Sequence, residues 1–148
     1  MSNSIGNKMD VRICGTHDKP VGYDVHIINT TSRSPNWSYA LSPFHVGPCD
    51  LYHGFVAKNV ENGYQFAKTY AQVNGVSHVD ENLEPNQNYF NWAMDGWSDD
   101  RAHRYPAGRG AIPLYSFWDG EQLDYIEARK KIYIPLYYNS ILIKYLHP

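Results

Sequence analysis

Three polar side chains recur at helical spacing in the segment Asn59–Lys68. Glu61, Gln65 and Lys68 stand at positions i, i+4 and i+7, which puts a carboxylate, an amide and an ammonium on one face of a helix. Such a polar stripe beside an apolar one could line a cleft that carries chemistry. A solvated helix face, held by ordinary contacts between neighbouring turns, is the other interpretation of the same spacing.

A second group of residues with chemical potential is the arginine- and glycine-rich segment Arg101–Gly110, which includes Arg104 and Arg109. A guanidinium donates two parallel hydrogen bonds that match a phosphate, and glycine lets backbone N–H groups approach an anion closely. The order of residues matches neither a Walker loop nor a dinucleotide-binding fingerprint. A surface loop with solvated arginines is the alternative.

Two cysteine and histidine pairs have spacings that resemble a zinc site, namely Cys14 with His17 and Cys49 with His53. The pairs lie far apart in the chain, and a chain of this length can bury a core without a metal. We therefore expect no bound metal and two free thiols.

The polar stripe of Glu61, Gln65 and Lys68 requires a helix, and the pattern predicts one over Asn59–Val73. Asn59 is the expected N-cap, and Glu61 falls in the first turn, where the helix dipole favours an anion. We therefore expect Glu61 to stay ionised. One apolar face supports this helix, formed by Val60, Tyr64, Ala67 and Ala71.

Two further helices are predicted. One covers Gln87–Asp95, preceded by Pro85 and ended by Gly96. The other starts near Asp119 and must end or kink at Pro135. Their expected inner faces carry Phe90, Ala93, Met94 and Trp97 in the first and Leu123 and Ile126 in the second, which also bears Lys130.

The remaining segments read as short strands or turns. Val11–Cys14 and Val25–Ile28 are predicted strands, and Ser98–Ser116 is rich in turn-forming residues. The apolar segment Ile134–Leu146 fits a helix and a strand equally well. The prediction is one compact α+β domain, largely helical with a few short strands, over residues 11–148, after a flexible tail at 1–10.

Composition excludes several classes of function. The 148 residues carry a net charge of −2, which gives no electrostatic case for binding duplex nucleic acid or an anionic membrane. No apolar run approaches a membrane span and no secretory leader is visible, so we expect a cytoplasmic protein. Aromatic residues make up 15% of the chain, and tyrosine and tryptophan often line sites for flat ligands. The oligomeric state stays open.

The segment Ser42–Lys68 resembles the NADAR superfamily, which is named for its link to NAD and ADP-ribose. The hallmark of that family is a segment ending in glycine, a helix that starts with a Ser-Val-Glu-His-like sequence, and then an aromatic residue, a glutamine and a lysine. Asn59 and Asn62 replace the usual serine and histidine. The residues that fit in order and spacing are Val60, Glu61, Tyr64, Gln65 and Lys68.

Later segments are similar to the family as well. Ala102–Arg104 looks like its basic turn, Trp118 like the tryptophan that opens its third helix, and Ala128–Lys130 like the lysine-bearing part of that helix. Family members usually continue to an acidic residue and a glycine-rich segment. No counterpart precedes Pro148, so we expect a shortened form, a fragment, or a protein that binds without turning over its ligand.

The resemblance implies a hydrolase, an N-glycosidase that cleaves the bond between ribose C1 and a nitrogen in an ADP-ribose-like or phosphorylated nucleotide, without a cofactor. Glu61 would be the catalytic residue, because a carboxylate stabilises an oxocarbenium-like ribose and can orient water. Arginine and lysine would hold phosphates, and an aromatic ring would stack on the base. The implied substrate-binding residues are Tyr64, Gln65, Lys68, Arg104, Arg109, Trp118 and Lys130.

Two other functions remain open. A binding module could sequester a nucleotide or ADP-ribose derivative without cleaving it, as the missing acidic segment would suggest. A protein–protein inhibitor or scaffold could use an aromatic surface, because tyrosine, tryptophan and arginine are also interface residues.

Overall fold

The computed structural model describes Arg12, Cys14 and residues 39–146, so the predicted tail at 1–10 and the predicted strand Val25–Ile28 lie outside the described residues. Arg12 and Cys14 are not in regular secondary structure. In chain order the elements are η1 (Tyr39–Leu41), β1 (Cys49–Asp50), β2 (Val56–Ala57), α1 (Val60–Gln65), β3 (Lys68–Thr69), β4 (Gln72–Val73), β5 (Val76–Ser77), α2 (Gln87–Ser98), β6 (Tyr115–Trp118), β7 (Glu121–Leu123), α3 (Tyr125–Ala128), the π-helical turn η2 (Arg129–Tyr133) and α4 (Ile134–Leu146).

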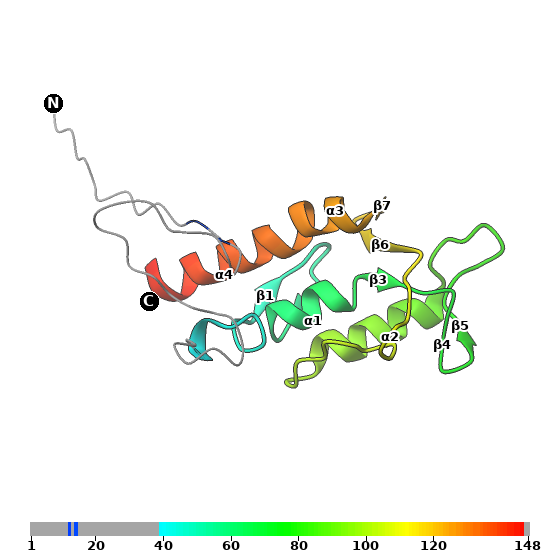
Figure 1. The fold of residues 1–148 in the computed structure, drawn as a ribbon, viewed down its shortest axis with the longest axis horizontal. Coiled ribbons are helices and arrows are strands. Elements are labelled where there is room, and N and C mark those ends of the chain that lie inside the picture. The colour runs from blue at the N-terminus through cyan, green and yellow to red at the C-terminus, as the bar shows by residue number, and fades with distance from the viewer. Residues whose placement is uncertain (1–11, 13, 15–38, 147–148) are drawn as a thin grey trace, which may run out of the picture.

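The fold combines helices with short antiparallel strands. Helix α4 runs along one side of the molecule and α2 along the other, and the short helix α1 lies between them (Figure 1). The strands form the pair β1–β2, the pair β4–β5 and a three-stranded sheet in the order β3-β6-β7. The predicted mixed α+β class is confirmed, but helices cover well under half of the described residues, so a largely helical chain is not confirmed.

The core lies between these layers and is rich in aromatic side chains. Tyr89 and Trp97 of α2 are 0% and 1% exposed, and they share one cluster with Val60 of α1 and Ile132 of η2. Burying each large side chain contributes about 1.5–3 kcal/mol. The phenol of Tyr89 donates a hydrogen bond to the carbonyl of Phe66 at 3.0 Å, so its polar end is satisfied inside the core.

The helix predicted over Asn59–Val73 is much shorter than expected. It begins at the predicted N-cap but ends at Gln65, because Lys68 and Thr69 pair with β6. Strands β4 and β5 then form a hairpin whose turn is Asn74-Gly75, with φ values of 51° and 77°. An Asn-Gly pair with positive φ at both positions is typical of a tight hairpin turn. Strand pairing and turn chemistry therefore override the helical pattern.

Helix α2 also differs from its prediction. It runs through Gly96 to Ser98, and its buried residues are Tyr89, Ala93, Gly96 and Trp97, whereas Met94 is exposed. A Cβ atom on Gly96 would lie 2.2 Å from the ring of Phe66. This glycine is therefore a point of close packing and does not end the helix.

The third helix begins later than predicted. Asp119-Gly120 forms the turn of the β6–β7 hairpin, with φ values of 48° and 81°, and Trp118 ends β6 instead of opening a helix. The N-cap of α3 is Asp124, whose side chain accepts from the backbone of Glu127 at 2.8 Å. The apolar C-terminal segment is helical, and the chain passes Pro135 through the widened turn η2 just before it.

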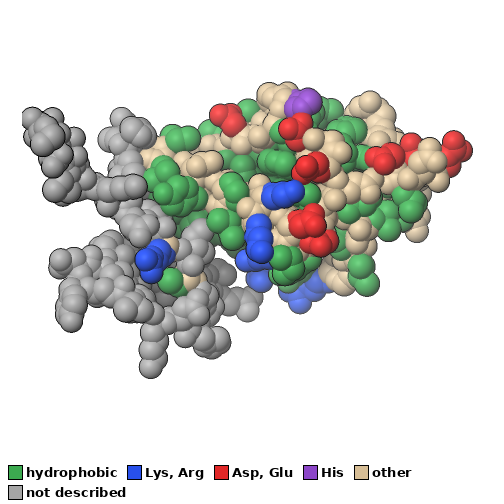
Figure 2. All heavy atoms as spheres, turned by 90° about the horizontal axis from the view of Figure 1, so that it is seen from above, with side chains coloured by type: hydrophobic (Ala, Val, Ile, Leu, Met, Phe, Trp, Pro, Cys, Tyr) green, Lys and Arg blue, Asp and Glu red, His purple; other side chains and the backbone are tan. Residues whose placement is uncertain are grey.

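The surface in Figure 2 mixes the two signs of charge. Basic and acidic side chains lie next to each other across the middle of this face. One ion pair of the surface joins Lys131 of η2 to Glu121 of β7 at 3.4 Å. Within the described part of the chain, no helix has both the length and the apolar character needed to cross a membrane.

The contact between Gly96 and Phe66 predicts the effect of one substitution. Gly96→Ala should destabilise the protein by about 1–3 kcal/mol, the usual cost of overpacking, although alanine is the better helix former by up to about 1 kcal/mol. Chemical denaturation measures the difference. The control is Asp95→Ala, which changes an exposed neighbour in the same helix. A Gly96→Ala protein as stable as the control would show that the Phe66 ring can move aside at no cost.

Candidate functional site

The site is built around the first turn of α1. The Oδ1 atom of Asn59 accepts the backbone N–H of Asn62 at 2.8 Å, which caps the helix. The first two backbone N–H groups of the helix donate to carbonyls of the preceding loop, Val60 to Val46 and Glu61 to Pro43, both at 2.9 Å. These N–H groups are therefore occupied by partners inside the protein.

Glu61 and Gln65 form the centre of the site. The Oε1 atom of Glu61 accepts a hydrogen bond from Nε2 of Gln65 at 2.9 Å, and the two residues are 6% and 8% exposed. The predicted one-turn spacing of the pair is thus confirmed. Glu61 and Gln65 face the interior and do not form a solvated helix face, whereas Lys68 of the predicted stripe lies beyond the helix in β3.

Three cations from three different segments act on this carboxylate. They are Lys68 of β3, Arg104 of the loop after α2, and Arg129 of η2. Lys68 and Arg129 are half-buried and Arg104 is exposed. The strand pairing that shortened the helix thus still leaves Lys68 within electrostatic reach of Glu61.

Burial decides the protonation behaviour of Glu61. Loss of solvation raises the pKa of its carboxyl above the ordinary value of 4.5, while the bond from Gln65 and the three cations lower it and offset only part of the rise. Burial therefore works against the predicted stabilisation of the charged form of Glu61 by the start of the helix. The physical reason is that the first N–H groups of α1 bind other partners and the carboxylate has left water.

Arg129 is the site residue that the sequence reasoning missed. Its guanidinium lies 5.1 Å from the ring centre of Tyr133 and 5.8 Å from that of Tyr125, and its charge also acts to lower the pKa of Tyr64. Burial, and then the negative charge of Glu61, raise the pKa of Tyr133 to about 12. The spacing Tyr125, Arg129, Tyr133 at i, i+4 and i+8 is the signal that would have revealed this stack.

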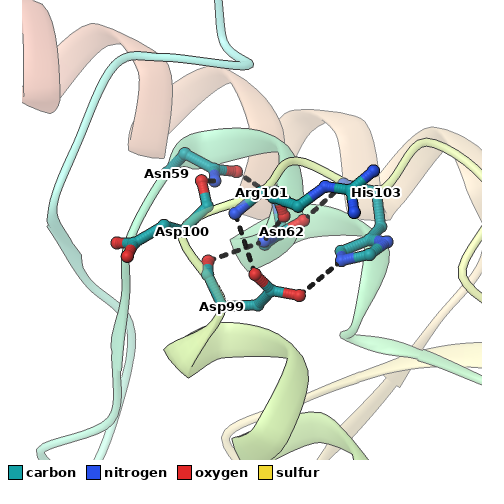
Figure 3. A network of polar contacts seen from close by, with 6 residues as sticks. All are labelled: Asn59, Asn62, Asp99, Asp100, Arg101 and His103. Atoms are coloured by element: carbon teal, nitrogen blue, oxygen red, sulfur yellow. Dashed lines mark hydrogen bonds and ion pairs between the residues drawn. The ribbon is translucent and has the colours of Figure 1, made fainter.

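The loop that carries Arg104 is attached to α1 by Asn62, as Figure 3 shows. The side-chain amide of Asn62 donates to the carbonyls of Asp99 at 3.2 Å and Arg101 at 2.8 Å. Its oxygen accepts the backbone N–H of His103 at 2.7 Å. Asn62 is 0% exposed, so in the folded protein the hydrogen bonds of its amide go to three backbone groups of one loop and none goes to bulk water.

A side-chain pair within the same loop joins His103 to Asp99. The Nε2 atom of His103 lies 2.7 Å from Oδ2 of Asp99, and the imidazole packs against the edge of the Phe66 ring with centroids 5.9 Å apart. The contact with His103 holds the pKa of Asp99 below its ordinary value, with help from the backbone N–H of Arg101.

The remaining predicted residues, Arg109, Trp118 and Lys130, are not among the groups that shift the pKa of Glu61. Arg109 and Arg104 both pack on Tyr105, at 5.2 Å and 5.7 Å from its ring centre, so Arg109 adjoins the site through that ring. Trp118 packs on Tyr52 with ring centres 4.9 Å apart. Lys130 is exposed on η2, beside the residue that does act on Glu61.

A cavity of about 400 Å³ lies between β1 and α4, and none of the predicted site residues lines it. Its lining includes Cys49, whose thiol pKa is raised to about 12 by burial. His53, which the sequence spacing would pair with Cys49 in a zinc site, is exposed and pairs with Asp119. His17 lies outside the described residues. Across Arg12, Cys14 and residues 39–146, no cluster of three or more His, Cys, Asp or Glu side chains is suited to a metal.

Comparison of the chain with family models, curated proteins and solved structures gave no match. The likeness to the NADAR family therefore rests on the motif residues around Glu61.

The raised pKa of Glu61 predicts how stability changes with pH. A carboxyl whose pKa is higher in the folded state contributes stability below about pH 4.5, and this contribution is lost as pH rises through the folded pKa. Glu61→Gln has no such titration. The variant should therefore gain stability relative to the parent as pH rises from 4 to 7, by about 1.4 kcal/mol for each unit of pKa shift. Denaturation of both proteins across this range tests the sign, and a parent that gains on the variant would contradict it.

Proposed function

We propose that this protein is an N-glycosidase of the NADAR type that hydrolyses the ribose C1–N bond of an ADP-ribose-like or phosphorylated nucleotide. The observation that carries the proposal is the buried carboxylate of Glu61, hydrogen-bonded by Gln65 and acted on by Lys68, Arg104 and Arg129. A solvated helix face would hold neither a buried carboxylate nor three cations from three segments.

The proposed chemistry has a place for each of these groups. The C1–N bond breaks and its electron pair leaves with the nitrogen, so positive charge develops on the ribose, where a carboxylate stabilises it. Water adds its oxygen to C1, and Glu61 passes the released proton to the leaving nitrogen. A raised pKa suits this transfer, because a general base works best when its pKa lies nearer the working pH.

The cations provide the second half of the proposal. Three positive groups face one carboxylate, so an anionic substrate group can join them without leaving an unbalanced negative charge. Arg104 is the most accessible of the three, and arginine can bind a phosphate through two parallel bonds. The substrate phosphate is therefore assigned to Arg104, with Lys68 and Arg129 nearer the sugar.

Binding without turnover is the second candidate, and the low exposure of Glu61, 6%, favours it. The exposed arginines on Tyr105 could hold a phosphorylated ligand that never reaches the carboxylate. Incubation with a panel of ADP-ribosyl and phosphoribosyl compounds separates the two candidates. Release of free base supports the glycosidase, whereas binding without release supports the sequestering module.

The catalytic assignment of Glu61 gives a direct test. Glu61→Gln keeps the shape of the side chain and removes its charge and its ability to take a proton, so turnover should fall by roughly 100–10,000-fold while ligand affinity changes little. Base release followed by chromatography measures the rate. The control is Glu127→Gln, an exposed carboxylate on α3. Cleavage by Glu61→Gln at the parent rate would remove Glu61 from the mechanism.

The phosphate assignment is tested on the same panel. Arg104→Ala should weaken the binding of phosphorylated ligands by about 1.5–3 kcal/mol relative to the unphosphorylated forms, because it removes hydrogen bonds between charged groups. Arg101→Ala is the matched control, since it removes the same charge from the same loop and keeps its backbone contacts. Titration calorimetry gives both affinities, and an unchanged preference in Arg104→Ala would refute the assignment.

A further inference from the structure

The loop after α2 has little regular structure to support it. No helix or strand occurs between Ser98 and Tyr115, yet this stretch contains Arg104, which acts on Glu61. Its first residues must therefore be held by contacts from elsewhere. On the side toward α1, Asn62 binds three backbone groups of Asp99, Arg101 and His103, and Asn59 adds one longer hydrogen bond of 3.4 Å to the carbonyl of Asp100.

The amide of Asn62 is not needed to satisfy its own helix. Asn59 already caps α1, and the carbonyls of the preceding loop accept the first two N–H groups. Every polar atom of the Asn62 side chain is instead used by residues that lie 37 to 41 positions further along the chain. The side chain therefore serves the loop.

The last anchored residue is the one before Arg104. Consecutive Cα atoms are about 3.8 Å apart, so holding the backbone of His103 also fixes where the Arg104 side chain starts. Asn62 directly follows Glu61 in α1, which puts the anchor and the carboxylate in the same helical turn.

We propose that Asn62 is a positioning residue, whose buried amide fixes the segment 99–103 on α1 and thereby brings Arg104 within electrostatic reach of Glu61. Its catalytic meaning depends on the proposed glycosidase function, but the positioning itself does not. Lys68 and Arg129 belong to β3 and η2, and they pack on the rings of Tyr64 and of Tyr125 and Tyr133, which are not part of this loop. Loss of the anchor should therefore remove one cation and leave the others.

The test follows the side-chain carboxyl of Glu61 by NMR titration. Arg104→Ala should raise the pKa of Glu61, because it removes a positive charge. Asn62→Ala should raise it too, although it changes no charge and keeps the backbone N–H that Asn59 caps. The double variant should show no further rise beyond Arg104→Ala, because both changes remove the same interaction. Full additivity, or a folded Asn62→Ala protein with an unchanged pKa, would overturn the proposal.

A purely structural role is tested with Asn86→Ala. Asn86 caps α2 and also binds the carbonyl of Ser77, so its loss destabilises the fold in a similar way but should leave the pKa of Glu61 unchanged. A rise in this control equal to that in Asn62→Ala would reduce Asn62 to a stability residue.

A second pair of variants keeps the test open if Asn62→Ala does not fold. His103→Pro removes the N–H that Asn62 accepts, whereas His103→Ala removes only the imidazole. The proline variant should raise the pKa of Glu61 more than the alanine variant, and equal shifts would count against the anchor. In turnover assays Asn62→Ala should lose roughly 10–100-fold, the scale that a misplacement of about 1 Å costs. A parent without turnover refutes the glycosidase and leaves the pKa test intact.

Discussion

The arrangement of the site depends on one buried amide. Asn62 joins two parts of the chain that have no strand or helix in common, the first turn of α1 and the segment that follows α2. A buried amide with all of its partners is stable, and the same amide without them costs about 1–3 kcal/mol for each unsatisfied group. The loop therefore has one favourable position on the helix. In the proposed family the same position usually carries a histidine, and an asparagine here gives a compact group with two donors and one acceptor.

A balance between burial and charge governs the neighbouring carboxylate. Taking Glu61 out of water raises its pKa, and the three cations and Gln65 lower the pKa again by part of that rise. Lys68 experiences the converse, since burial lowers its pKa and Glu61 raises it. Each group thus supports the charged form of the other. A ligand that brought its own negative charge would change the pKa values of Glu61 and Lys68 at once.

The sequence predicted the beginnings of helices better than their ends. Asn59 is the N-cap as expected, because a cap is a local interaction that three or four residues decide. The end of α1 at Gln65 depends on strand β6, almost 50 residues away, which no local pattern reports. The turns Asn74-Gly75 and Asp119-Gly120 are hairpin signals that the sequence shows, and they would have corrected the end of the first predicted helix and the start of the third. At the site, the pairing of Glu61 with Gln65 followed from helical spacing. Arg129 was missed because its position depends on packing against Tyr125 and Tyr133, and the helix that carries them was predicted with other bounds.

The short length of α1 has a consequence for how the protein folds. A helix of six residues is far below the roughly 12–15 that an isolated helix needs in water, so it exists only when its long-range partners are already in place. The groups around Glu61 cannot therefore assemble as an early local unit. Backbone amide protons of α1 that donate to the 43–46 loop should exchange with solvent only through the largest opening reactions of the molecule. A partly folded chain would keep the sequence motif and have no site.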